Sequence, residues 1–322
     1  LILVSIDILD KESFVWWLTG LYYLRLILMI LYSFSLYIPR FSFKFPDNYK
    51  EILSYSIYIL LAGSAASLLI DIDKYMIPQK QAISQTAYYA VAVFIATVVE
   101  IPGRAMFQIL NPMVAKAINN NDFKELNNLY QKSSSNLLIL SGFIFLIINL
   151  NISSFYLLMN NDLYSDGIWV VLIISLAKLI QMSFGCGPAI LATSSFYKIT
   201  LPFSIAMAIS VYFLNDILID IYGINGAAIS TLIVLFSFTI LKVFYINYKL
   251  NIQPYNRNTI KILLIVCALY LSINYIGFEY SALIDIVLRS LIVSIIYLGL
   301  IYYLGLSKNI NQTIKSIFSK HL

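Results

Sequence analysis

Charged residues, histidine and cysteine are all scarce in this chain. Its 322 residues include one histidine and two cysteines, and only 11% of them are charged. In soluble globular domains about a quarter of the residues are charged, because such domains must present a polar surface to water. The scarcity of charge therefore excludes an ordinary soluble domain.

The rarity of histidine and cysteine also limits the chemistry available to the chain. The single histidine, His321, stands next to the C-terminal residue, which excludes zinc sites and the usual histidine-based acid-base catalysis. Cys186 and Cys267 lie far apart within apolar stretches, so we interpret both as small core residues. We accordingly expect neither an enzyme nor a cofactor.

Apolar residues make up 60% of the chain and gather in long stretches. A membrane-spanning helix needs roughly 20 mostly apolar residues to cross the hydrocarbon layer. Stretches of this kind predict an all-α integral membrane protein, a polytopic bundle of about nine transmembrane helices. The predicted spans are Leu18–Ile38, Ile52–Ile70, Thr86–Gln108, Leu137–Leu158, Ile168–Leu191, Ile199–Ile221, Gly226–Tyr248, Ile260–Ile276 and Leu283–Leu306.

Lysine and arginine residues set the expected orientation, because basic residues are retained on the cytoplasmic face. One alternate set of connections is rich in them, from Arg40 and Lys44 to Lys308 in the tail. The other set holds only Lys74 and Lys80. This alternation predicts an external N-terminus and a cytoplasmic C-terminus. It also accounts for the net charge of +5 without a nucleic-acid-binding face.

The longest cytoplasmic connection carries a weaker pattern. Phe123, Leu126 and Tyr130 follow helical spacing, and either Asn121 or Asp122 is the expected N-cap. The pattern fits a short amphipathic helix on the membrane surface and a solvated connector equally well.

Four segments carry distinctive patterns in order along the chain. They are Ile70-Asp-Ile-Asp-Lys-Tyr-Met, Asn111-Pro-Met-Val-Ala-Lys with the following Asn-Asp-Phe-Lys-Glu-Leu, Gly187-Pro-Ala-Ile-Leu-Ala-Thr, and Tyr222-Gly-Ile-Asn-Gly-Ala-Ala-Ile-Ser-Thr. In the last segment, Gly223 and Gly226 permit a tight turn and close helix packing. Together the segments resemble those of bacterial polysaccharide (O-antigen type) flippases in the multidrug/oligosaccharidyl-lipid/polysaccharide exporter (MATE-like) superfamily.

Such flippases have fourteen helices, in two bundles of six plus two more. The resemblance therefore implies that the predicted spans are helices six to fourteen, and that a chain beginning with Leu1 lacks about five preceding helices. It also implies a division of the sequence into four parts. These are the last helix of the N-terminal bundle with its linker (1–47), a six-helix C-terminal bundle (48–250), two additional helices (251–306) and a cytoplasmic tail (307–322).

The resemblance implies translocation of a polyprenyl-diphosphate-linked oligosaccharide across the bacterial cytoplasmic membrane by alternating access. The expected partners are this lipid-linked oligosaccharide, membrane lipids and other polysaccharide assembly proteins. A cation-coupled multidrug exporter is the alternative, and it would favour intramembrane carboxylates over basic groups. A membrane polysaccharide polymerase or ligase fits less well, because such enzymes carry a large external loop and the predicted outer connections are short.

Basic residues inside predicted spans are candidates for substrate binding, because an isolated charge in hydrocarbon costs about 3 kcal/mol or more. Arg25, Lys178 and Arg104 all fall within such spans. A lipid diphosphate that crosses the membrane needs positive charge in place of its lost hydration. The alternatives are that Arg25 snorkels to the interface and that Lys178 pairs with Glu100.

Acidic residues are candidates for a coupling-ion site or a gate. Glu100 precedes Pro102, which removes a backbone hydrogen bond and bends the helix, although Glu100 is also spaced to pair with Arg104. Asp285 and Arg289 are spaced for an intrahelical ion pair. The carboxylates near the external ends of predicted spans form either a cation-admitting mouth or a set of interfacial groups that reach water. They are Asp71, Asp73, Asp216 and Asp220.

Overall fold

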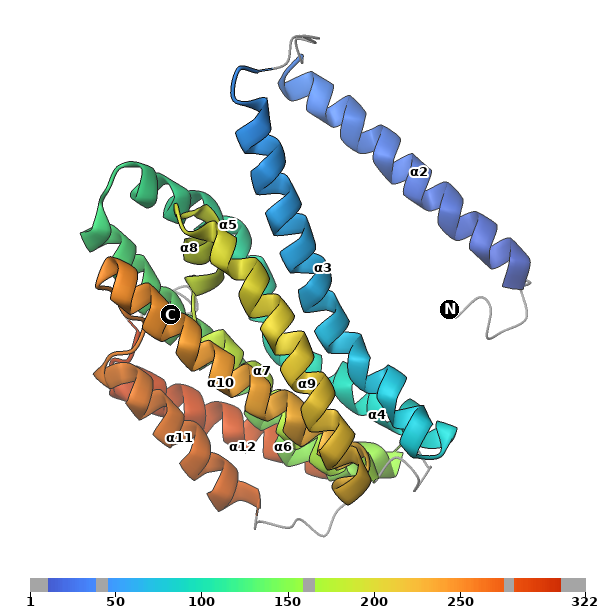
Figure 1. Cartoon of the computed structure of the whole chain (residues 1–322). Coiled ribbons are helices and arrows are strands. Elements are labelled where there is room, and N and C mark those ends of the chain that lie inside the picture. The colour runs from blue at the N-terminus through green and yellow to red at the C-terminus, as the bar shows by residue number, and fades with distance from the viewer. Residues whose placement is uncertain (1–10, 39–45, 159–165, 275–280, 308–322) are drawn as a thin grey trace. The chain divides into compact units, whose positions relative to one another are not determined.

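The computed structural model describes residues 11–38, 46–158, 166–274 and 281–307, and every regular element in these ranges is helical (Figure 1). The chain divides into two units, Leu1–Glu51 and Ile52–Leu322. The first unit contains helix α2 (Lys11–Leu36), whose apolar side chains are exposed along its length.

The second unit is a bundle of α-helices with two short 3₁₀ turns, and its first helix begins shortly before the unit boundary. In chain order the elements are α3 (Tyr49–Lys80), α4 (Ile83–Thr97), η1 (Val98–Glu100), α5 (Ile101–Asn119), α6 (Phe123–Leu158), α7 (Ile168–Ser183), α8 (Gly187–Thr193), η3 (Tyr197–Ile199), α9 (Thr200–Tyr222), α10 (Ile224–Leu250), α11 (Arg257–Asn274) and α12 (Ala282–Tyr303).

Six helical stretches of the described chain are long and apolar enough to cross a membrane, and the bent pair α7–α8 makes a seventh if it forms one span. These lengths and compositions support a multi-pass membrane protein. The expected count of nine is not confirmed within the described residues. The remaining predicted spans, Ile52–Ile70 and Ile260–Ile276, correspond to α3 and α11, and both extend into side chains outside the described residues. The six single stretches are Ser13–Leu36, Ile83–Asn119, Phe123–Leu158, Tyr197–Tyr222, Ile224–Leu250 and Ala282–Tyr303.

The surface of the helices carries large apolar side chains that are open to the surroundings. Phe94 is 75% exposed, Phe244 70% and Ile295 71%. Apolar surface of this extent is typical of contact with lipid rather than water. Cys267 is also exposed, so its interpretation as a core residue is wrong, whereas Cys186 is buried as expected.

Helix α6 forms the centre of the bundle and packs against α5, α7, α11 and α12. It begins at Phe123, so the segment with amphipathic spacing is its first two turns and not a separate surface helix. Asp122 is the N-cap, because its Oδ1 accepts the Glu125 amide at 3.0 Å. Leu126 and Tyr130 are fully buried against neighbouring helices, so the surface-helix and solvated-connector predictions are both wrong.

The connection between α9 and α10 confirms the predicted tight turn. Gly223 has a φ of +58°, which a residue with a side chain rarely adopts. A Cβ atom at Gly226 would lie 1.9 Å from the carbonyl oxygen of Leu218. The two glycines therefore allow α9 and α10 to lie side by side, as Figure 1 shows.

The predicted span Ile168–Leu191 is not one straight helix. It is broken between α7 and α8, with a bend of 56°. Serine side chains of α6 meet the backbone groups at the break: Ser134 Oγ donates to the Ser183 carbonyl at 2.6 Å, and Ser133 Oγ accepts the Cys186 amide at 2.9 Å. Such side-chain partners make a broken helix tolerable inside a membrane.

Candidate functional site

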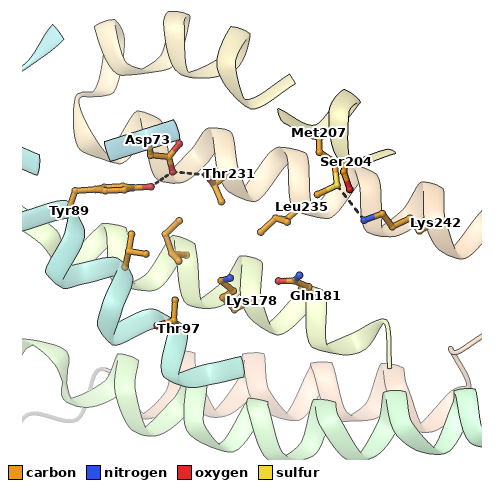
Figure 2. A pocket seen from close by; sticks show the side chains of 12 residues that line it. Asp73, Tyr89, Thr97, Lys178, Gln181, Ser204, Met207, Thr231, Leu235 and Lys242 are labelled. Carbon is orange, nitrogen blue, oxygen red and sulfur yellow. Dashed lines mark hydrogen bonds between the residues drawn. The ribbon is translucent and has the colours of Figure 1, made fainter. Parts of the chain in front are cut away.

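A cavity of about 180 Å³ lies between α3, α4, α7, α9 and α10. Ionisable side chains are spread along it: Asp73 lies at one end in Figure 2, Lys242 at the other and Lys178 between them. Hydroxyl and amide groups complete its polar lining, supplied by Tyr89, Thr97, Gln181, Ser204 and Thr231. A polar cavity enclosed by apolar helices is a candidate binding site.

The acidic end of the cavity is formed by Asp73 of α3, which is only 3% exposed. Its carboxylate accepts hydrogen bonds from three other helices: from the Tyr89 hydroxyl of α4, from Asn215 Nδ2 of α9 at 2.6 Å, and from Thr231 Oγ1 of α10 at 2.9 Å. Hydrogen bonds to a carboxylate are among the stronger ones in proteins. This carboxylate therefore ties four helices together.

Lys178, at the middle of the cavity, is the first member of an ion-pair chain that leads away from it. Lys178 Nζ lies 2.9 Å from Glu100 Oε2, and the other oxygen of Glu100 accepts Arg104 Nη2 at 2.7 Å. Both predicted pairings of Glu100 are thus confirmed. Lys178 faces the cavity and is 8% exposed, and it shares the carboxylate of Glu100 with Arg104.

Glu100 is the last residue of the 3₁₀ turn η1, which separates α4 from α5. Pro102 lies at the start of α5, where it cannot donate a backbone hydrogen bond. The expected bend at this proline stays a prediction: the structure shows a short 3₁₀ turn just before it, within the single stretch Ile83–Asn119.

The basic end of the cavity is formed by Lys242 of α10. Its amine lies 3.3 Å from the sulfur of Met207, and no carboxylate of the described chain lies within ion-pair distance. Lys242 is not among the predicted site residues. The sequence could have indicated it, because Lys242 interrupts the apolar stretch Gly226–Tyr248 just as Lys178 interrupts the apolar stretch Ile168–Leu191.

The other three carboxylates expected at an external mouth do not line the cavity. Asp71 is exposed and pairs with Lys74 at 3.0 Å. Asp216 and Asp220 of α9 both bind Lys80 at the end of α3, at 2.8 and 2.7 Å. Hydrogen bonds to these two carboxylates raise the pKa of Lys80 above its ordinary value. The four carboxylates therefore do not converge on one site.

Neither arginine candidate is among the residues that line the cavity. Arg25 is exposed on α2, in the separate first unit. The side chain of Arg104 is 70% exposed and reaches Glu100 from outside. The predicted pair Asp285–Arg289 is confirmed at 3.1 Å; since Arg289 also donates to the Leu150 carbonyl, it holds α12 on α6.

Comparisons with protein-family models, with curated proteins and with solved structures give no match. The likeness to polysaccharide flippases therefore rests on the sequence segments alone. Within the described ranges, no group of three or more histidine, cysteine, aspartate and glutamate residues is placed to hold a metal ion. Chemically, the cavity can accommodate a small polar group, with a hydrogen-bonded carboxylate at one end and an ammonium group at the other.

Proposed function

We propose that this chain belongs to a membrane transporter that moves a polyprenyl-diphosphate-linked oligosaccharide across the bacterial cytoplasmic membrane by alternating access. The observation that carries the proposal is the polar cavity among helices whose outer surfaces are apolar. Ionisable groups are costly at membrane depth and are retained mainly where they serve a pathway. The sequence segments that resemble those of polysaccharide flippases suggest the substrate class.

Two residues have proposed roles in the conformational cycle. Asp73 is the candidate ligand of a coupling cation, because it is the one carboxylate among the described residues that line the cavity. Its partners Asn215 and Thr231 carry further oxygen atoms that can bind a cation. Glu100 is the candidate for gating, because it lies in the 3₁₀ turn between α4 and α5 and pairs with Lys178 across the helices.

The test is a flipping assay with the complete natural protein in proteoliposomes. A fluorescent polyprenyl-diphosphate disaccharide is placed in both leaflets, and a membrane-impermeant quencher is added outside. Transport predicts quenching beyond the outer-leaflet half, at a rate that falls strongly in an Asp73→Leu variant that still folds. Quenching that stops at the outer leaflet, as in protein-free liposomes, contradicts the proposal.

A cation-coupled multidrug exporter is the second candidate, and one observation favours it. Asp73 faces a cavity whose other lining groups include the apolar Val93, Ile174 and Leu235, which suits a lipophilic cation. Expression in a drug-sensitive host distinguishes the two functions. Resistance to tetraphenylphosphonium, without rescue of a polysaccharide-deficient strain, would favour the exporter.

A membrane polymerase or ligase receives no comparable support. The described connection between α9 and α10 consists of Gly223 alone, which leaves no room there for a catalytic loop. Sugar transfer by the purified protein in vitro would nevertheless favour this third function over transport.

A further inference from the structure

The two lysines that line the cavity differ in how their charges are balanced. Lys178 has a carboxylate partner, Glu100, at 2.9 Å. Lys242 contacts only the thioether sulfur of Met207, at 3.3 Å, among the described residues. A thioether is a weak acceptor and carries no charge, so it replaces little of the hydration that an ammonium group loses on burial. Within the described ranges Lys242 therefore has no carboxylate that balances an ammonium charge.

The surroundings of Lys242 are rich in hydrogen-bonding groups and poor in acidic groups. The residue lines both the cavity of about 180 Å³ and a second cavity of about 100 Å³ enclosed by α7, α8, α9 and α10. Gln181 and Ser204 also line both, and the smaller one adds Thr200 and Thr239. Among the residues that the structure describes, no acidic side chain lines the smaller cavity. In Figure 2 the one acidic residue of the larger cavity lies at the far end from Lys242.

We infer that Lys242 binds an anionic group of the phosphate class at the junction of these two cavities. The inference rests on the proposed transport function and adds the residue that contacts the charged part of the solute. An ammonium group and a phosphate oxygen form a charge-assisted hydrogen bond, which compensates both charges between the apolar helices. Lys178 is not the primary contact, because a ligand there would have to displace Glu100.

The test is ligand binding to the complete natural protein, purified in detergent and titrated with three probes. Farnesyl diphosphate carries both lipid and anion, farnesol carries only the lipid, and inorganic pyrophosphate carries only the anion. The variants are Lys242→Met, Lys242→Arg and the matched control Lys249→Met. Lys249 lies on the same helix, at its end, and faces the ring of Tyr248 rather than the cavity.

Lys242→Met should weaken farnesyl diphosphate binding by about 10-fold to 100-fold, the range expected for a lost hydrogen bond to a charged group. Lys242→Arg should retain most of the affinity, Lys249→Met should retain all of it, and farnesol binding should not change. A site for free phosphate rather than a lipid headgroup would bind pyrophosphate as tightly as farnesyl diphosphate, with the same dependence on Lys242.

Unchanged farnesyl diphosphate affinity in Lys242→Met overturns the inference, as does an equal loss of farnesol binding, which would indicate a packing defect. Lys242→Gln replaces the methionine variant if that protein does not purify as a single species. Failure of the proposed function is distinguishable: diphosphate binding that depends on Lys242, without any flipping in proteoliposomes, contradicts transport and leaves the anion contact intact.

Discussion

The two ends of the cavity differ in the number of polar partners that their charged side chains have, and this difference separates a role in stability from a role in binding. At the acidic end, Asp73 accepts hydrogen bonds from three helices and is almost completely buried. At the basic end, Lys242 faces a thioether sulfur. A buried polar group with a full set of partners stabilises the arrangement around it, whereas a partly buried charge without a counter-ion adds little stability and can attract a ligand. Substitutions at the two ends should therefore have opposite consequences.

The largest effect is expected at the acidic end. Asp73→Leu leaves the donors Tyr89, Asn215 and Thr231 without their acceptor, so the free energy of unfolding in detergent should fall by about 3–5 kcal/mol. The control is Asp71→Leu, an exposed position on the same helix, which should cost less than about 1 kcal/mol. Equal losses at the two positions would remove the distinction between the buried and the exposed carboxylate.

Glu100 and Lys178 should behave as a coupled pair when the free energy of unfolding is measured. Glu100→Leu leaves the buried charge of Lys178 without its partner and should lower the free energy of unfolding by about 3 kcal/mol. The double variant Glu100→Leu/Lys178→Leu should recover most of that loss, because neither charge remains in the interior. If the loss in the double variant equals the sum of the losses in Glu100→Leu and Lys178→Leu, the two residues do not stabilise the protein as a pair.

A single donor at the acidic end should matter less. Thr231→Val removes one of the hydrogen bonds to Asp73 while keeping the shape of the side chain, and should cost about 1 kcal/mol. Thr97→Val is the matched control, because the Thr97 hydroxyl also lies at the cavity but donates to the Phe94 carbonyl of its own helix. A smaller loss for Thr231→Val than for Thr97→Val would show that the carboxylate does not organise this end.

The smallest effect on stability is expected at the basic end. Lys242→Met removes an unpaired charge from the bundle and should change the free energy of unfolding by less than about 0.5 kcal/mol, or raise it. The same unfolding measurement in detergent checks this. A loss as large as that of Asp73→Leu would mean that the lysine has a structural partner and that the two ends are alike.

The parts of the fold that depend on local sequence could be predicted. Helical spacing identified the pairs Glu100–Arg104 and Asp285–Arg289, and the glycines at 223 and 226 identified the turn between α9 and α10. The helix positions followed from runs of apolar residues. Each of these features depends on residues within a few positions of one another, which a single sequence displays directly.

Features that depend on distant contacts could not be predicted in the same way. Asp71 and Asp73 have the same residue type and nearly the same position, yet only Asp73 meets Asn215 and Thr231 from helices far along the chain. The break between α7 and α8 likewise depends on serine side chains from α6. Lys242 had a sequence signal equal to that of Lys178, but its lack of a carboxylate partner is visible only in three dimensions.

The central claim is that apolar, membrane-embedded helices enclose a polar cavity that water can enter. Cysteine labelling in intact membranes tests it most directly, in a background with Cys186→Ala and Cys267→Ala, by comparing Lys242→Cys with its neighbour Leu241→Cys. Leu241 is 49% exposed on the outside of the bundle, where lipid should suppress the reactive thiolate. The account predicts that a membrane-impermeant sulfonated thiol reagent modifies Lys242→Cys and leaves Leu241→Cys unmodified. Faster labelling of Leu241→Cys would contradict it.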